Sequence, residues 1–182
     1  MLPKPFLDSL EGLPGFDKNA FEQVHAQGEQ ITSVRLNKYK QFDLHTHPFL
    51  NATTPVSWCA QGVYLSERPL FVLDPLWHAG AYYVQEASSM FLEQVFGFVK
   101  SKFNGPIKVL DLCAAPGGKS THLLAMCEHD DVVVSNEVIK SRLGVLLENI
   151  HKQGYNNSIV CHADSSDFEA LGPLFDVIVV DA

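Results

Sequence analysis

The stretch Val109-Leu-Asp-Leu-Cys113-Ala-Ala-Pro116-Gly-Gly118-Lys-Ser120-Thr-His-Leu-Leu-Ala125 joins an apolar segment to a glycine-rich turn and then to a second apolar segment. This order predicts a strand, a tight turn and the start of a helix. Gly117 and Gly118 allow the backbone to approach a ligand where a Cβ would collide, and the free N–H groups of the helix face the same place. The stretch therefore predicts a ligand cradle, although a purely structural corner between strand and helix has the same pattern.

Alternating strand and helix patterns follow this turn. We expect strands at 107–113, 132–136, 158–162 and 175–181, and helices at about 119–128, 139–152 and 166–171. Strands separated by helices indicate an α/β fold with a parallel sheet and right-handed crossovers. Val132-Val-Val134 and Val177-Ile-Val-Val180 are continuously apolar, as expected of strands that helices cover on both faces.

A small α/β module is expected over residues 1–40. Asp17 fits the N-cap of a helix that runs through Gln27 and ends at Gly28. Residues 31–37 then predict a strand.

The remaining chain divides into a connecting segment and a main domain. Prolines punctuate residues 41–84, which we interpret as connecting structure packed on the main domain. The main domain is expected over residues 85–182 and to begin with an amphipathic helix at 85–99. Its last strand would leave an apolar edge uncovered after Val180, so we expect the natural protein to continue beyond Ala182.

The composition is that of a soluble globular protein, with 46% apolar and 19% charged residues. No apolar run approaches the roughly 18 to 20 residues that span a bilayer, and Met1–Phe6 lacks the apolar core of a secretion signal. We therefore expect a cytoplasmic protein. The net charge of −8 argues against a stand-alone nucleic-acid binder, because domains that bind by neutralising phosphates are usually basic.

The cysteines and histidines show no metal-binding pattern. The cysteines at 59, 113, 127 and 161 lack CxxC spacing, so we expect reduced thiols, and Cys113 is expected to be buried and inert. His45-Thr-His47 offers two ligands without a third in a supporting pattern, so no metal site is predicted. The other histidines, His122 among them, are expected to be surface or core residues.

Polar residues follow each predicted strand. Ligands of an open parallel sheet lie beyond the carboxyl ends of the strands, near the point where strand order reverses. The four strand ends supply the turn Cys113–Ser120 and then Glu137, Asp164 and Asp181. Glu137 comes about 20 positions after Gly117, where a carboxylate can accept hydrogen bonds from two ribose hydroxyls. A solvated loop carboxylate is the alternative for Glu137.

The third and fourth strand ends have roles of their own. Asp164 could accept the amino group of an adenine stacked on Val138 and Ile139, cap the helix that starts near Ser166, or do both. Asp181 lies at the strand end nearest the first turn, where it could receive a substrate or cofactor ammonium.

Two nucleotide-binding patterns do not match. The P-loop pattern GxxxxGK[ST] fails because Cys113 stands at its first glycine, although Lys119 and Ser120 fit its end. The pattern GxGxxG fails because residues 115–118 have a different glycine spacing and a proline. A Pro-Gly-Gly turn with carboxylates after the second and third strands suits a nucleoside without a pyrophosphate, for which S-adenosylmethionine is the obvious candidate.

The stretch Asp111-Leu-Cys-Ala-Ala-Pro-Gly-Gly-Lys-Ser120 closely resembles the cofactor motif of the Nop/Sun family of RNA cytosine-5 methyltransferases. Other segments resemble further motifs of the family: Arg35-Leu-Asn37, Tyr82-Tyr-Val-Gln85-Glu-Ala-Ser88-Ser-Met90, Asn136-Glu137 with Arg142, and Asp181-Ala182. Trp58-Cys-Ala-Gln-Gly62 and His78-Ala-Gly-Ala-Tyr82 are most similar to its bacterial ribosomal RNA branch. The resemblance covers the chain from about residue 20 to the end.

This resemblance implies a Rossmann-like S-adenosylmethionine-dependent methyltransferase fold, here with the first four strands of its parallel sheet. It implies that S-adenosylmethionine contacts Cys113, Ala114, Ala115, Pro116, Gly117, Gly118, Lys119, Glu137, Asp164 and Asp181. In the family a cysteine thiolate adds to carbon 6 of an unstacked cytosine, which makes carbon 5 nucleophilic enough to take the methyl group. That cysteine follows the Asp-Ala pair, so we expect this sequence to bind the cofactor without turnover. Ribosomal RNA is the partner expected for the full-length protein.

Two other functions fit the same residues. A non-catalytic domain could bind an adenosine ligand in this pocket for sensing or assembly. A nucleotide phosphate could instead bind at Lys119 and Ser120, in which case ATP would bind and S-adenosylhomocysteine would not.

Overall fold

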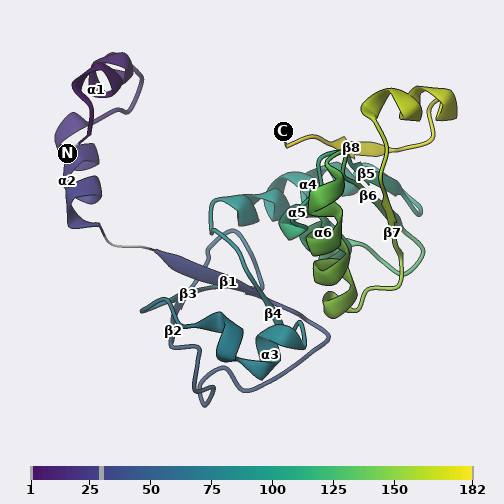
Figure 1. Ribbon diagram of the computed structural model, residues 1–182, viewed down its shortest axis with the longest axis horizontal. Coiled ribbons are helices and arrows are strands. Elements are labelled where there is room, and N and C mark those ends of the chain that lie inside the picture. Colours follow the sequence, from purple (N-terminus) through teal and green to yellow (C-terminus); the bar gives the residue numbers. More distant parts are fainter. Residues whose placement is uncertain (1, 29–30, 182) are drawn as a thin grey trace. The chain divides into compact units, whose positions relative to one another are not determined.

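The computed structural model of the protein describes residues 2–28 and 31–181. It divides into two compact units, residues 1–31 and residues 32–182 (Figure 1). The boundary expected near residue 40 differs from this division, because the strand that begins at Thr32 belongs to a sheet of the second unit. Ala182, part of the last motif noted above, lies outside the described residues.

The first unit consists of two helices, α1 (Lys4–Leu10) and α2 (Lys18–Gln27). Asp17 caps α2 by accepting a hydrogen bond of 3.0 Å from the backbone N–H of Ala20. The helix ends at Gly28, whose φ of 63° lies in the left-handed region that glycine adopts without strain. Both ends confirm the sequence prediction.

An antiparallel sheet opens the second unit. Its strands are β1 (Thr32–Leu36), β2 (Ala52–Pro55), β3 (Gly62–Leu65) and β4 (Tyr82–Val84), in the order β2-β3-β1-β4. The short helix α3 (Pro75–His78) contacts β4. Residues 41–84, expected to be an irregular connecting segment, therefore supply three strands. The prolines did not prevent these strands, because Pro55 lies at the very end of β2, where a missing N–H costs little.

One of the two histidines considered as metal ligands belongs to the core of this sheet. The His47 Nε2 atom lies 3.5 Å from a carboxylate oxygen of Asp74, and both side chains are buried. The same oxygen accepts a hydrogen bond from the hydroxyl of Tyr82, which is fully buried. His47 is thus held by a carboxylate and aromatic neighbours.

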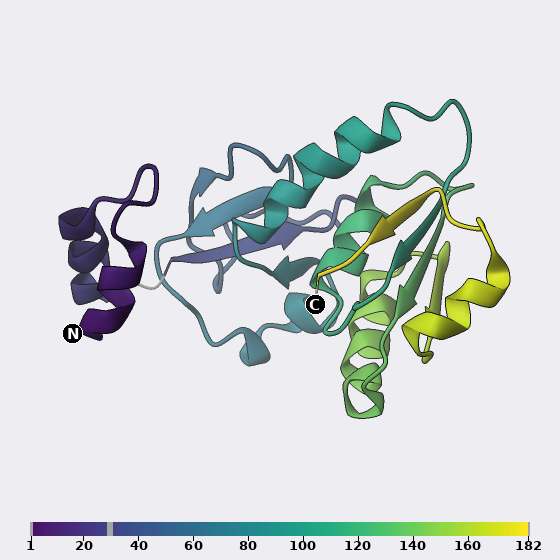
Figure 2. The same ribbon diagram turned by 90° about the horizontal axis from the view of Figure 1, so that it is seen from above.

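A parallel sheet forms the rest of the unit (Figure 2). Its strands are β5 (Lys108–Asp111), β6 (Val132–Asn136), β7 (Ser158–Cys161) and β8 (Val177–Val179), in the order β7-β6-β5-β8. The connecting helices are α4 (Leu92–Lys100) before β5, α5 (Gly118–Met126), α6 (Lys140–Gln153) and the 3-10 helix η3 (Ser165–Leu171). This arrangement confirms the predicted α/β fold, and strand order reverses on the two sides of β5.

Two details differ from the sequence prediction. The helix expected at 85–99 begins later, with a 3-10 turn at Ser89–Phe91 followed by α4, because residues 85–88 form the connection from β4. The outer strand β8 is also less covered than expected, since Ile178 is 57% exposed whereas Leu110, its partner on β5, is 2% exposed.

Asp131 ties the amino ends of β5 and β6 together. Its side chain, in the turn before β6, is buried and accepts hydrogen bonds from the N–H groups of Ile107 (2.9 Å) and Glu128 (2.7 Å) and from Lys100 Nζ (2.5 Å). Burial alone would raise the pKa of this carboxyl, but the hydrogen bonds outweigh it and hold the pKa below the ordinary 3.8. The native state therefore favours the charged carboxylate.

No helix among the described residues has the length and apolar character that crossing a bilayer would require.

We predict that Asp131→Asn lowers the free energy of unfolding by about 2 kcal/mol at pH 7, because charge-assisted hydrogen bonds are lost. A depressed native pKa stabilises the fold above the unfolded pKa and ceases to do so as the pH falls through the native pKa. The difference in the free energy of unfolding between the wild type and Asp131→Asn should therefore shrink below about pH 4. Denaturant unfolding at several pH values measures this difference. The exposed neighbour variant Asp130→Asn should change little, and an Asp131→Asn deficit that is independent of pH would contradict this account.

Candidate functional site

The turn between β5 and α5 is fixed by β6 and α6. The N–H of Ala114 donates to the carbonyl of Asn136 at 2.8 Å, and Asn149 Nδ2 donates to the carbonyl of Pro116 at 2.7 Å. Backbone groups that would otherwise face solvent are thereby paired with a neighbouring strand and helix. The turn is preorganised before any ligand binds.

Gly117 is the residue whose conformation starts α5. Its φ of 109° lies in the left-handed region, and a Cβ there would stand 3.3 Å from Leu146 Cδ1 and 3.4 Å from Asn149 Cβ. Gly118 has an ordinary φ, and a Cβ there would only touch the ring of Tyr83 at 3.4 Å. The requirement for glycine therefore lies mainly on Gly117.

A cavity of about 230 Å³ lies beside this turn. One side is formed by Cys113, Ala114, Ala115, Pro116, Gly118 and Lys119, together with Asp181 after β8. The other side comes from β4 and the connection after it, through Tyr83, Val84, Gln85, Glu86 and Ser89. The cavity thus lies where strand order reverses, as the parallel sheet predicts. Cys113, expected to be buried, is half-buried and lines it.

Lys119 and Asp181 form an ion pair at the cavity, which places Asp181 beside the first turn as expected. The Asp181 side chain is 59% exposed. Solvent-exposed ion pairs contribute little to stability. A charged ligand can therefore displace Lys119 from Asp181, or Asp181 from Lys119, with little loss of folding stability.

Glu137 lies beside the turn but not on the wall of the cavity. It is 2% exposed, so it is not the solvated loop carboxylate that we considered. One oxygen accepts a hydrogen bond of 2.8 Å from the N–H of Ile139, and the other accepts one of 3.2 Å from the N–H of Ala115. Arg142 Nη1 lies 3.6 Å from this second oxygen. The carboxylate is therefore held rigidly against the turn.

Asp164 is exposed and also lies outside the cavity wall. It caps η3 by accepting a hydrogen bond of 3.0 Å from the N–H of Ser166, and its own N–H donates to Asp167. Hydrogen bonds from Ser166 lower the pKa of Asp164. The capping role is confirmed. Val138 and Ile139, the residues considered for stacking, are 50% and 48% exposed.

Asp111, the last residue of β5, has no role among those expected from the sequence. It is 1% exposed and accepts a hydrogen bond of 2.6 Å from Ser120 Oγ, while its Oδ1 atom has no hydrogen-bond partner among the described residues. Burial raises the pKa of this carboxyl. The available sequence signal was a carboxylate at the end of an apolar strand. Burying a charged carboxylate costs free energy unless it is paired, so such a residue indicates a binding or structural role.

A buried network joins the antiparallel sheet to α5. Arg35 on β1 is 1% exposed, and its Nε donates to Gln85 Oε1 at 2.8 Å while its Nη2 donates to Thr121 Oγ1 at 2.8 Å. Thr121 in turn donates to the carbonyl of Gly117 at 2.7 Å. The guanidinium therefore links both walls of the cavity. These contacts span up to 86 positions of sequence, so local pattern could not reveal them.

Comparison with known families accounts for most of the chain. Residues 2–87 match the N-terminal domain of 16S rRNA methyltransferase RsmF, and residues 103–182 match 16S rRNA methyltransferase RsmB/F. Ribosomal RNA small subunit methyltransferase F of Escherichia coli O127:H6 is 36% identical over 159 residues, which are 82% of this chain. The protein of the same name from Erwinia tasmaniensis is 34% identical over 194 aligned positions, 99% of this chain. The chain spans 33% and 39% of these two relatives.

Solved structures show the same fold. A methyltransferase homolog from Pyrococcus horikoshii superposes with a TM-score of 0.67 at 25% identity, covering 97% of this chain and 62% of that one. NSun6 from the same organism, solved with SFG, gives a TM-score of 0.73 at 16% identity, covering 99% and 70%.

We predict that Gly117→Ala destabilises the protein by about 1 to 2 kcal/mol, because alanine is strained at this φ. Gly144→Ala is the matched control, since Gly144 lies on α6 with an ordinary φ and open space at its Cβ position. There alanine should be neutral or stabilising by up to about 1 kcal/mol. Denaturant unfolding of the two variants compares them. Equal effects at both positions would show that the turn does not depend on the left-handed residue.

Proposed function

Because this chain belongs to the RsmB/F family of 16S rRNA methyltransferases, we propose that it forms the cofactor-binding part of a ribosomal RNA cytosine-5 methyltransferase. The family uses S-adenosyl-L-methionine. The observation that carries the proposal is the cavity against the rigid turn Cys113–Lys119. The buried carboxylate of Glu137 is held against the same turn, outside the cavity wall, and the half-exposed Val138 and Ile139 follow it. Each of these features suits a different part of that cofactor.

We assign the sugar and base of the cofactor to the end of β6. Glu137 is fixed by two backbone N–H groups and keeps free lone pairs for ribose hydroxyls. Because its side chain is buried outside the cavity wall, a small local movement must expose these oxygens when the cofactor binds. Val138 and Ile139 follow it with about half of their surface exposed, which suits contact with the face of an adenine. Asp164 would receive the adenine amino group, since its capping bonds leave acceptor capacity on the carboxylate.

The methionine part of the cofactor would lie in the cavity near Lys119 and Asp181. Its ammonium can take the place of Lys119 beside Asp181, while Lys119 can turn to the carboxylate. The turn Pro116–Gly118 would approach the sulfonium through its backbone. Bound in this way, the cofactor supplies the electrophilic methyl group.

Cys59, Cys127 and Cys161 do not suit the attack on cytosine carbon 6, and Cys113 lines the proposed cofactor cavity. Burial raises the pKa of Cys59 to about 11 and that of Cys127 to about 12, so both are protonated at neutral pH. Burial also raises the pKa of Cys161. We therefore assign the nucleophile to another region of a longer protein, in keeping with the share of the relatives that this chain spans. Ribosomal RNA is the proposed substrate of that longer protein.

We predict that the chain binds S-adenosylhomocysteine in a calorimetric titration and does not bind ATP. Glu137→Ala should weaken binding at least about tenfold, because a loss of 1.4 kcal/mol, about one hydrogen bond to a charged group, corresponds to that factor. Glu169→Ala, an exposed carboxylate on η3, is the control and should bind like the wild type. Binding of ATP alone would favour a phosphate site at Lys119 and Ser120 instead.

A further inference from the structure

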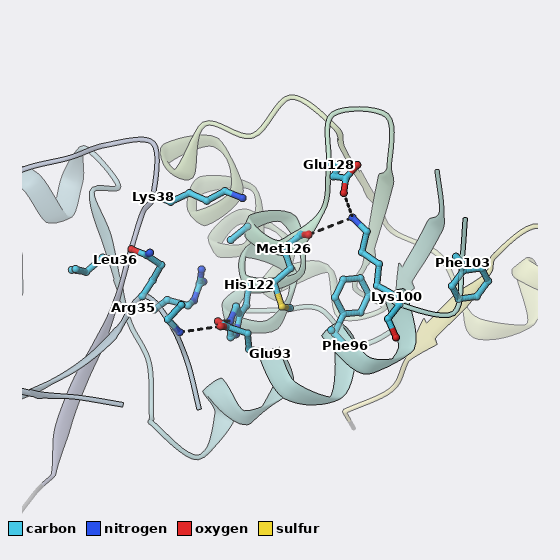
Figure 3. A pocket seen from close by; sticks show the side chains of 15 residues that line it. Arg35, Leu36, Lys38, Glu93, Phe96, Lys100, Phe103, His122, Met126 and Glu128 are labelled. Carbon is cyan, nitrogen blue, oxygen red and sulfur yellow. Dashed lines mark hydrogen bonds and ion pairs between the residues drawn. The ribbon is translucent and has the colours of Figure 1, made fainter. Parts of the chain in front are cut away.

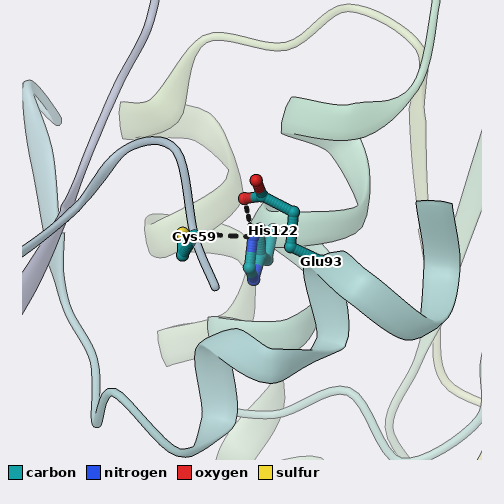
Figure 4. A group of neighbouring side chains, drawn as sticks. All are labelled: Cys59, Glu93 and His122. Carbon is teal, nitrogen blue, oxygen red and sulfur yellow. Dashed lines mark hydrogen bonds and ion pairs between the residues drawn. The ribbon is translucent and has the colours of Figure 1, made fainter. Parts of the chain in front are cut away.

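A cysteine, a glutamate and a histidine meet inside the second unit, apart from the cavity described above. Cys59 lies in the loop between β2 and β3, Glu93 in the first turn of α4, and His122 on α5. Figure 4 shows Cys59 and Glu93 directed at the same nitrogen of the His122 ring. The distances from His122 Nε2 are 3.8 Å to Cys59 Sγ and 3.2 Å to Glu93 Oε2. All three candidate ligand atoms lie within 4.8 Å of one another.

We propose that Cys59, Glu93 and His122 form a zinc site that ties the antiparallel sheet to α4 and α5. Thiolate, imidazole and carboxylate are the ligands that Zn²⁺ takes in proteins. With bond lengths of about 2.0 to 2.3 Å, a tetrahedral zinc ion separates its ligand atoms by about 3.3 to 3.6 Å. The two observed separations fall within a few tenths of an ångström of that range. Small side-chain movements therefore suffice to place an ion between the three atoms.

The loop that carries Cys59 is held in place by other contacts. Trp58 Nε1 donates to the carbonyl of Ala87, and the carbonyl of Trp58 accepts a hydrogen bond of 2.9 Å from Gln94. The N–H of Ala60 donates to Glu93 Oε1 at 2.9 Å, which leaves the other oxygen of Glu93 for a metal. Contacts of this kind orient metal ligands and raise affinity.

The chemistry of the three ligands suits a dication. The imidazole of His122 would coordinate in its neutral form, through a ring-nitrogen lone pair, and the Cys59 thiol would lose its proton to solvent as the S–Zn bond forms. The thiolate and the carboxylate together neutralise the dication, so the loaded site adds no net charge beside the guanidinium of Arg35.

An open cavity reaches two of the three residues, Glu93 and His122. The cavity, of about 530 Å³, is lined by Glu93 and His122 and by charged residues such as Lys100 (Figure 3). A water molecule in this cavity can complete the tetrahedron, as in zinc sites with three protein ligands. No sequence pattern predicts this site, because Cys59, Glu93 and His122 are too far apart in sequence to form a recognisable ligand spacing.

Cobalt titration tests the proposal, because Co²⁺ occupies zinc sites and reports its ligands through absorption. The whole chain, treated with a chelator and kept reduced without added thiols, should bind one equivalent of Co²⁺. The spectrum should contain a thiolate-to-cobalt charge-transfer band and tetrahedral ligand-field bands, and Zn²⁺ should abolish both. Zn²⁺ should also raise the melting temperature in proportion to the logarithm of its concentration.

Matched variants decide which residues hold the ion. Cys59→Ser should remove the charge-transfer band, and His122→Gln should weaken Co²⁺ binding at least about tenfold. Cys127→Ser, at another buried thiol, should keep the full spectrum. Absence of the band in the wild type, or its survival in Cys59→Ser, would overturn the proposal and leave the three residues as a hydrogen-bonded cluster. Circular dichroism checks that each variant is folded, and zinc-dependent stabilisation of the wild type gives a readout that needs no variant.

Discussion

The left-handed conformation of Gly117 is the constraint on which the site depends. It allows α5 to start at Gly118, at the end of the turn that follows β5, with its free N–H groups beside the cavity. Any other residue would be strained at this φ, and its Cβ would lie in tight contact with Leu146, 3.3 Å away. Because β6 and α6 also pair its backbone groups, the turn keeps its shape without a ligand. A preformed cradle loses little entropy when it binds.

The second requirement is that the antiparallel sheet stays against α5. Arg35 supplies this link, because its buried guanidinium contacts Gln85 on one wall of the cavity and Thr121 behind the other. The proposed zinc site lies at the same junction and would add a second link through His122, also on α5. Both links join segments that are distant in sequence, so each stabilises the tertiary arrangement rather than a local element.

Local pattern predicted the parts of the fold that depend on neighbouring residues. The N-cap Asp17, the C-terminal Gly28 of α2 and the alternation of β5 to β8 with helices all follow from spacing and backbone chemistry. The antiparallel sheet was not predicted, because β3 and β4 are fixed by pairing with β1, across up to about 50 positions, and β2 is fixed by pairing with β3. The position of Asp181 beside the first turn could be predicted, because the carboxyl ends of the parallel strands β5 and β8 lie at the same edge of their sheet. The burial of Glu137 depends on contacts with Ala115 and Arg142 that no local pattern encodes.

The structure of the chain in complex with S-adenosylhomocysteine would show directly whether this turn holds the cofactor. We expect density for the ligand along the turn Pro116–Lys119, with the ribose hydroxyls on Glu137 and the adenine against Val138 and Ile139. An occupied site elsewhere, or a ribose that lies away from Glu137, would contradict this expectation.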